Sequence, residues 1–419
     1  MSSKNTNIAG AASSLYRVLD YIRRYGPLAK KDLQRYTGLS WGSISNYTAR
    51  LLAEGIIVEC SGPRGISKGR NPSSYAVNRK KNWILGLDVQ MNCLSGVVVA
   101  LDGFRLYSAT VDLKNRDASE VFGNILDLLE RLFHSVQTPR EIKRVGFSMP
   151  GLIDPKPGKP LAVYHFTGVF PGNMLKLIGE RFGVPAAIFH DPDCMLMIHF
   201  NSMPPDEYAM MIDSNVVLIR WSYGIGSALL LNGKLYYGDH GASGEIGHTV
   251  VDPAGPLCIC GNKGCLEVYA SFRAVLEQVY AVIEEGRFDP EPYCRNGLIR
   301  DAIWAAYRQK DPAILPIVNT AVDYMVSAVV NMVNVLDPRI LIFDGEFATA
   351  PRECFDRLRA GIAGRIKGEP VTIKVLPWEN SGAIGAAEML VQEVFFETLW
   401  NEIRDRTASC RDTLPSAAG

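Results

Sequence analysis

The sequence predicts an α/β protein that carries a helix-turn-helix domain at its N-terminus. Three observations support this prediction. Apolar strand-like runs followed by helical patterns occur twice, first from Trp83 and again from about Val216. Basic residues are concentrated in residues 1–80. Three cysteines lie within eight positions, between Cys258 and Cys265, in a segment rich in glycine. We therefore expect a small basic head followed by a larger body.

Length and composition are those of an ordinary globular protein. The 419 residues are 47% hydrophobic and 21% charged, which allows two or three domains with sizeable cores. No run of about 18 apolar residues occurs and the first ten residues contain no apolar leader, so we expect a cytoplasmic chain without a membrane span. Nine cysteines, three of them grouped, fit a reducing compartment better than a disulfide framework.

The net charge of zero conceals an uneven distribution. Residues 1–80 contain 13 Lys and Arg against 4 Asp and Glu, a net charge of +9. The remaining residues contain 31 against 40, a net charge of −9. Such asymmetry favours nucleic acid as the partner of the head, although a solvated basic surface has the same composition.

The head begins with three predicted helices. Apolar side chains recur at helical spacing over residues 14–25, until Gly26-Pro27 ends the pattern. A short second helix is predicted over 29–36, and Ser40 is a suitable N-cap for a third helix over 41–54. Helix, short turn and helix form the helix-turn-helix arrangement, which trihelical packing modules also resemble.

The third helix is expected to have one buried and one outward face. The buried positions are predicted to be Ile44, Tyr47, Leu51 and Leu52. The outward face includes Trp41 and the side chains that we predict to contact DNA, which are Ser43, Ser45, Asn46 and Arg50.

Two strands, over 56–59 and 74–77, are predicted after these helices. The loop between them carries three basic side chains among glycines: Arg64, Lys68 and Arg70. Such side chains suit contact with phosphates or with the minor groove. The head is therefore predicted to be a winged helix-turn-helix domain over residues 1–80.

The body is predicted to follow as two comparable α/β halves. In the first half, strands are predicted over 83–89, 95–102, 105–113 and 144–148, and one long helix is predicted over 118–134. The second half has strands over 216–222, 227–231, 234–238 and 340–344, with helices between and after them. We assign residues 81–400 to this body and residues 401–419 to a disordered tail.

A four-ligand metal site is predicted in the second half of the body. His248 precedes Cys258, Cys260 and Cys265, and thiolate and imidazole are the ligands that tetrahedral Zn²⁺ prefers. Four protein ligands leave no open position for water, so we expect the zinc to be structural. The alternative is three ordinary buried cysteines.

The same stretch resembles the ROK family, which contains sugar-responsive repressors and sugar kinases. The resemblance is carried by GEIGH, from Gly244 to His248, and by CxCGxxGCLE, from Cys258 to Glu267. It implies a duplicated actin-like, sugar-kinase-like body of two lobes. It also implies that Glu245, His248 and Glu267 bind a sugar, although Glu245 also suits a turn cap and Glu267 a helix start.

The resemblance extends to the sugar-binding residues of the first half. Asp191 matches the aspartate of the family's Asn-Asp pair, which is the base in the kinases, and His190 replaces the Asn. His199 stands where the family has a glutamate, and Gly151 matches a Pro-Gly turn beside the sugar. Both histidines also suit helix packing.

The phosphate-binding loops of the family's kinases are altered in this chain. Asp88-Val89-Gln90-Met91-Asn92 stands where the kinases have Asp-x-Gly-Gly-Thr, and Ser222-Tyr223-Gly224-Ile225-Gly226 where they have Gly-Thr-Gly-Ile-Gly. Asp344-Gly345-Glu346 adds two acidic side chains to a nucleotide-side turn. Side chains and negative charge hinder close approach of phosphates, so we predict that the chain is not an enzyme.

These features predict a sugar-responsive transcriptional repressor that binds operator DNA as a homodimer or homotetramer. Two alternatives stay open. The first is a sugar kinase with a DNA-binding head, and the second is a repressor that a phosphotransferase-system protein releases from DNA. Activation instead of repression is also compatible with the sequence.

Overall fold

The computed structural model describes residues 3–61, 73–154, 159–163, 166–211, 214–293, 298–376 and 382–391. They form two compact units. The described part of the first unit comes from residues up to 209 and from 382–391, and the second unit lies within residues 210–380. The first unit contains both the head and the first lobe of the body, so the boundary near residue 80 remains a prediction. The predicted tail over 401–419 lies outside the described residues.

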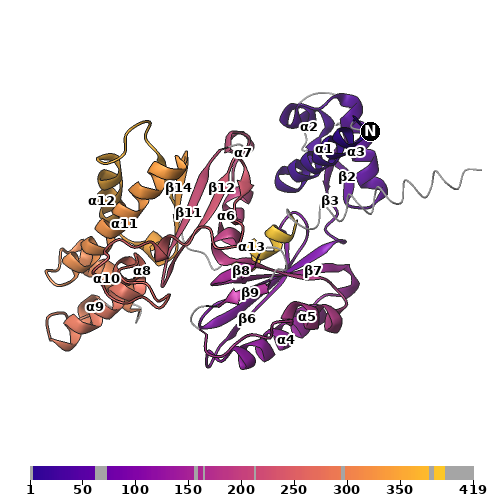
Figure 1. The fold of residues 1–419 in the computed structure, drawn as a ribbon. Helices are drawn as coiled ribbons and strands as arrows, with labels where there is room; N and C mark the ends of the chain where they lie inside the picture. The colour runs from indigo at the N-terminus through magenta and orange to yellow at the C-terminus, as the bar shows by residue number, and fades with distance from the viewer. Residues whose placement is uncertain are drawn as a thin grey trace, which may run out of the picture. The chain divides into compact units, whose positions relative to one another are not determined.

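The head contains three helices and a small antiparallel sheet (Figure 1). Its elements in chain order are α1 (Ser3–Tyr25), β1 (Leu28–Ala29), α2 (Lys30–Thr37), α3 (Trp41–Ala53), β2 (Ile57–Ser61) and β3 (Ser73–Val77). The sheet order is β1-β3-β2. All the predicted helices and strands are present, whereas α1 begins at Ser3 instead of residue 14 and the short strand β1 was not predicted.

Helix α3 is fixed by its cap and by one buried face. The Ser40 side chain accepts a hydrogen bond from the Ser43 backbone N–H at 3.2 Å, which satisfies an unpaired donor of the first turn. The buried residues of the helix are Ile44, Thr48 and Leu51. The prediction of Tyr47 and Leu52 as buried was wrong in degree, since both are only partly buried. Thr48 is buried instead because its hydroxyl donates to the Ile44 carbonyl at 2.8 Å.

The first lobe is built on a five-stranded sheet in the order β10-β7-β4-β5-β6. Its strands are β4 (Trp83–Val89), β5 (Cys93–Val99), β6 (Arg105–Asp112), β7 (Ile142–Met149) and β10 (Ala186–His190). Helices α4 (Ala118–His134) and α5 (Met174–Phe182) join one apolar core with these strands. Further elements are β8 (Leu152–Asp154), β9 (Lys159–Ala162), α6 (Asp191–Asn201), α7 (Pro205–Met211) and α13 (Gly382–Met389).

Helix α13 covers the sheet face opposite α4. Along β4, Leu85 and Leu87 belong to the core with α4, so the alternating positions point to the other face. There a Cβ at Gly86 would overlap the Ala383 carbonyl oxygen, and a Cβ at Gly146 of β7 would lie 2.6 Å from the Ala386 carbonyl oxygen. The two glycines therefore allow the backbone of α13 to contact the sheet directly.

The second unit repeats this sheet with the strand order β13-β12-β11-β14-β15. Its strands are β11 (Val216–Trp221), β12 (Ile225–Leu231), β13 (Lys234–Leu235), β14 (Ile340–Asp344) and β15 (Thr372–Val375). Its α-helices are α8 (Glu267–Ala270), α9 (Phe272–Glu284), α10 (Ile299–Arg308), α11 (Ile314–Leu336) and α12 (Arg352–Ala363). In both sheets an antiparallel hairpin is followed by two parallel strands. The α/β prediction is confirmed, and the matching strand orders are those of a duplicated fold.

Helix α11 is long and apolar enough to cross a membrane by length and composition. Half of its most apolar window is buried inside the protein. Buried residues of α11 pack in one core with residues of α9, α10 and α12, and the helix also carries Asn319, Asp323 and Asn331. We interpret α11 as the central core helix of the second unit.

Gly86→Ala is expected to destabilise the first unit by about 3 kcal/mol, because the added methyl overlaps backbone that cannot move independently. Gly123→Ala is a matched control. Gly123 lies within α4, and a Cβ there would meet no atom within 4 Å, so helix propensity predicts stabilisation of about 0.5–1 kcal/mol. Denaturant unfolding of both variants measures the difference, and equal free energies of unfolding would disprove the close packing of α13.

Candidate metal centre and ligand-binding residues

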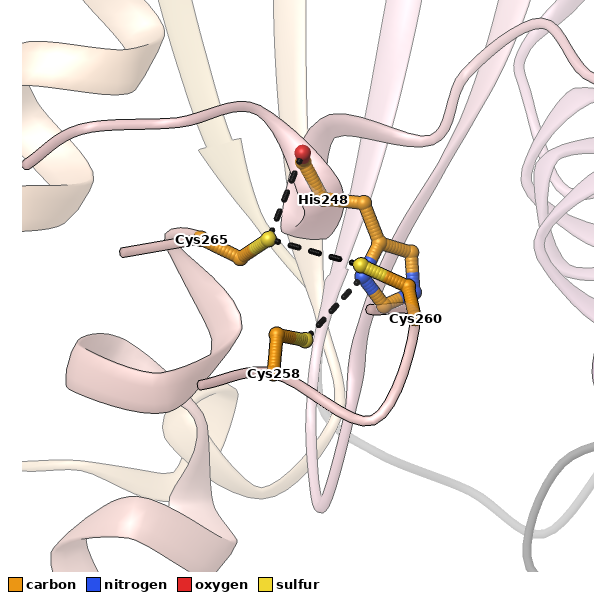
Figure 2. Close-up of side chains that lie close together, drawn as sticks. All are labelled: His248, Cys258, Cys260 and Cys265. Carbon is orange, nitrogen blue, oxygen red and sulfur yellow. Dashed lines mark hydrogen bonds between the residues drawn. The ribbon is translucent and has the colours of Figure 1, made fainter. Parts of the chain in front are cut away.

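The structure brings the four predicted metal ligands together (Figure 2). His248 ends the short 3₁₀ turn Ile246–His248, and Cys258, Cys260 and Cys265 lie on the loop that precedes α8. One ligand atom from each of the four residues lies within 4.8 Å of the other three. Cys258 and Cys265 are buried, whereas Cys260 is exposed.

The spacing of these atoms fits a tetrahedral ion. Cys258 Sγ lies 3.6 Å from His248 Nδ1, and Cys260 Sγ lies 3.6 Å from Cys265 Sγ. Zinc binds sulfur at about 2.3 Å and nitrogen at about 2.0 Å, which gives tetrahedron edges of about 3.5–3.8 Å. Burial, and then the Cys260 and Cys258 thiols, raise the pKa of Cys265 to about 12. A bound dication would lower that pKa because it stabilises thiolates. The donor set therefore fits a divalent metal ion.

Backbone pairing holds the cysteine loop in this shape. Val250 pairs with Cys265 and Leu257 pairs with Lys263 in isolated antiparallel bridges. Between them Gly264 adopts φ +66°, and a Cβ there would overlap the Asp252 carbonyl oxygen. No other residue fits this position without moving the chain. The loop therefore depends on its glycine for the tight return that places Cys265 beside His248.

His248 faces two groups of atoms. Its Nδ1 faces Cys258, while its Nε2 lies 3.8 Å from Glu245 Oε2. The two ring nitrogens therefore have different neighbours, a thiol at Nδ1 and a carboxylate at Nε2. A metal bound at Nδ1 would fix the orientation of the ring and of Nε2. The geometry thus joins the metal centre to one predicted sugar-binding residue.

Glu267 is the first residue of α8 and its side chain is only 6% exposed. Its Oε2 accepts a hydrogen bond from the Ile225 backbone N–H at 3.1 Å, and its Oε1 lies 3.8 Å from Arg273. Part of its hydrogen-bonding capacity is therefore used within the second unit. The carboxylate holds residues 222–226, the segment predicted to be an altered phosphate loop, through Ile225, and the sequence did not reveal this role.

The remaining predicted sugar-binding residues lie in the first unit. Strands β7 and β10 are parallel neighbours in which Met149 pairs with His190, so Gly151 and Asp191 follow adjacent strand ends. Gly151 is buried with φ +104°. Asp191 begins α6, and its Oδ1 lies 3.7 Å from His190 Nε2. The carboxyl ends of neighbouring parallel strands are a common place for ligands.

His199 lies on α6 but not beside this carboxylate. It follows Asp191 by two turns, about 12 Å along the helix axis, and is buried with an exposed fraction of 6%. Its ring packs edge-on against Phe200 at 6.4 Å between centroids. The six predicted sugar-binding residues thus form two groups, with Gly151, His190 and Asp191 in the first unit and Glu245, His248 and Glu267 in the second.

Side chains make polar contacts in the segments that were predicted to be altered phosphate loops. In the first unit, Gln90 Nε2 donates to Asp88 Oδ2 at 2.6 Å. In the second unit, Arg220 pairs with Asp344 at 2.9 Å and Ser222 donates a hydrogen bond to Glu346. Each contact includes at least one residue of these predicted loops.

The outward side of α3 is partly engaged within the head itself. Ser43 Oγ lies 3.0 Å from Ser40 Oγ, and Ser45 Oγ accepts from Lys30 Nζ at 3.3 Å. Lys30 also lies 6.0 Å from the Trp41 ring centroid and 5.9 Å from that of Tyr75. Lys30 was not predicted as a DNA contact from the sequence, because it belongs to α2 and reaches α3 only through the fold.

The other predicted DNA-contacting residues differ in how far the structure describes them. Trp41 is 54% exposed and Asn46 is exposed at the surface of α3, while Arg50 is partly buried. Arg64, Lys68 and Arg70 of the predicted wing lie outside the described residues.

Comparisons with known proteins agree with these observations. The family model of the ROK family matches residues 84–393. The xylose repressor of Bacillus spizizenii is 23% identical over 381 residues, which cover 90% of this chain and 94% of the repressor. The N-acetylglucosamine repressor of Escherichia coli O6:H1 is 23% identical over 343 residues, which cover 81% of each chain.

A similar fold occurs in the crystal structure of a ROK family transcriptional regulator that is a homologue of the E. coli MLC protein. The two structures agree with a TM-score of 0.75 at 24% identity, over 94% of this chain and 99% of the other. Because the family model matches about three quarters of the sequence, this chain belongs to the ROK family.

Proposed function

We propose that the chain is a transcriptional repressor that binds DNA through its head and changes its affinity for DNA when a sugar binds to its body. One observation carries this proposal. The ROK match begins at residue 84, and the three helices and antiparallel sheet of the head precede it as an addition to the family domain. The xylose repressor of Bacillus spizizenii matches 90% of this chain, and residues 81–419 make up only about 81% of it, so that match includes part of the head.

The proposed DNA-binding surface is the outward side of α3. Residues at the N-terminal end of a recognition helix reach base edges in the major groove. Ser43, Ser45, Asn46 and Arg50 are the proposed contacts on α3, with Arg64, Lys68 and Arg70 from the wing. We add Lys30, because its ammonium group lies beside Ser45 and the net charge of +9 over residues 1–80 favours phosphate contact.

The metal ion is proposed to be a structural zinc. Four protein ligands close its coordination sphere, so the ion supplies no open position for chemistry. His248 would bind it through Nδ1 and present Nε2 beside Glu245, where a sugar hydroxyl can bond to both groups. Glu267, Asp191, His190 and Gly151 are the other proposed contacts to the sugar.

A sensing role without catalysis is supported by the side chains in the altered loops. Phosphoryl transfer needs backbone and cations around the nucleotide phosphates. In the second unit, Arg220 is neutralised by Asp344, and Glu346 adds an acidic side chain to the same predicted loop, so neither favours a bound phosphate. A carboxylate such as Asp191 would then orient a bound sugar without acting as a base.

The proposed active form is a homodimer or homotetramer in the cytoplasm, since one recognition helix reads only one half-site of an operator. Two other functions remain to be tested. A sugar kinase would turn over ATP, and a repressor released by a phosphotransferase-system protein would respond to that protein and to no sugar.

Cys265→Ser is expected to reduce bound zinc from about one ion per chain to nearly none, because it removes one of four ligands. At free zinc a thousandfold above its Kd, the lost stabilisation is about 4 kcal/mol. Elemental analysis and denaturant unfolding measure both effects. Cys354→Ser is the control, since Cys354 is buried on α12 in the same unit and lies outside the ligand cluster. Full metal content in Cys265→Ser would contradict the zinc proposal.

A sugar that binds the body is expected to weaken DNA binding by about 5- to 150-fold. Selection from a random duplex library identifies the DNA, and a panel that includes D-xylose and N-acetylglucosamine supplies the sugars. Glu245→Gln should retain DNA binding and lose the response, whereas Asn46→Ala should weaken DNA binding and retain sugar binding. Glu285→Gln, an exposed carboxylate of the same unit, is the control. A wild-type chain that selects no DNA sequence would contradict the proposed function.

A further inference from the structure

A buried cluster of charges joins the head to the first lobe. We call it the joint cluster, and its members are Asp20, Arg23, Arg24, Tyr208 and Glu388. Arg23 is held on both sides: its Nη1 donates to Glu388 Oε2 at 2.8 Å, its Nη2 donates to Glu388 Oε1, and its Nε donates to Asp20 Oδ1 at 3.0 Å. The Arg23 and Glu388 side chains are 1% and 4% exposed, although 365 positions separate them in the chain.

The cluster is electrically balanced but incompletely satisfied. Asp20 also accepts from Arg24 Nε at 3.0 Å and from the Tyr208 hydroxyl at 2.8 Å. Burial alone would raise the pKa of Asp20, but Arg24, Arg23 and the Tyr208 hydrogen bond outweigh it and hold that pKa below its ordinary value. Arg24 Nη1 and Nη2 have no hydrogen-bond partner among the described residues, although Nη2 lies 3.5 Å from Glu388.

Such a joint can open more readily than an apolar one. Desolvation of buried ions offsets most of their mutual attraction, so separated and hydrated partners are close in free energy to the closed pair. An apolar contact of the same size would lose its hydrophobic stabilisation on opening and gain nothing from water. A joint held by charge pairs therefore suits a head that takes two positions, one with the ion pairs closed and one with them separated and hydrated.

Helix α13 connects this joint to the proposed sugar site. Glu388 lies one turn after Gly385, and a Cβ at Gly385 would overlap the carbonyl oxygen of Cys194. Cys194 belongs to the first turn of α6, which begins at Asp191. At the start of α13, a Cβ at Gly382 would overlap the Asp88 carboxylate. A displacement of the first turn of α6 thus meets α13 directly, without an intervening flexible side chain.

We propose that Arg23 and Glu388 are positioning residues which transmit a change at the start of α6, through α13, to the head. The proposal rests on the proposed function for its effect on DNA binding. The transmission itself is a property of the first unit, and it can be measured without DNA or sugar.

The test is amide hydrogen exchange of α1 over residues 18–25 in four forms of the full chain: wild type, Gly385→Ala, Glu388→Gln and the double variant. Gly385→Ala forces α13 away from α6, so we expect exchange in α1 to rise at least fivefold. In Glu388→Gln the joint cluster is already loosened, so the addition of Gly385→Ala should raise exchange in α1 by less than a further twofold. If Glu388 had a merely structural role, the two substitutions would act independently, and their fold-changes in the exchange rate would multiply in the double variant.

Gly361→Ala is the matched control, because a Cβ there would lie 2.9 Å from Val326 Cγ2 in the second unit. It should leave exchange in α1 unchanged. If Gly385→Ala does not fold, Asp191→Asn replaces it, since the loss of a negative charge at the start of α6 weakens its first turn. Asp191→Asn should raise exchange in α1 at least twofold, and this rise should vanish when Glu388→Gln is also present. Multiplying effects, or no effect on α1, would overturn the proposal.

Selection from the random duplex library separates this proposal from the proposed function. If the chain selects no DNA sequence but the exchange effects do not multiply, the proposed role of the joint cluster stands and the proposed DNA-binding function fails. If the chain selects a DNA sequence but the exchange effects multiply, the proposed function stands and the proposed role of the joint cluster fails.

Discussion

Direct backbone contact between α13 and the first sheet is the constraint on which the first unit depends. Gly86 of β4 and Gly146 of β7 carry no side chain at this face, so the backbone of α13 seats against the two strands at these points, at a distance that no other residue allows. This contact returns the end of the described chain to its first lobe. It also places Glu388 within hydrogen-bonding distance of Arg23 in the head. The packing of α13 therefore covers the sheet and also determines where the head is attached.

The second unit depends on a comparable local constraint. The tight return at Gly264 brings Cys265 beside His248, and the ring of His248 then relates the ligand cluster to Glu245. Glu267 follows within the same segment and holds Ile225 through its backbone N–H. A short piece of chain therefore contains the four candidate metal ligands and both glutamates that we propose as contacts to a sugar.

Most regular elements could be predicted because their information is local. The helix over 118–134 and the strand over 340–344 have the predicted bounds, since periodic apolar residues and an Asp117 cap or flanking polar residues define them. The metal ligands were predictable for the same reason, because they lie within one short segment. Arg23 and Glu388 were not predictable, since no sequence pattern relates two charges at opposite ends of the chain. Lys30 was missed because it reaches α3 from another helix, and Thr48 because its hydroxyl is satisfied by the backbone of its own helix.

We propose that the kinase-like body senses a sugar without using ATP. Calorimetric titration of the zinc-loaded full chain tests it most directly, with a panel of monosaccharides and amino sugars in one series and a non-hydrolysable ATP analogue in the other. At least one sugar is expected to bind with a stoichiometry of one per chain, and the ATP analogue is expected to release or absorb no heat of binding. Binding of the ATP analogue, or silence from every sugar, would contradict it.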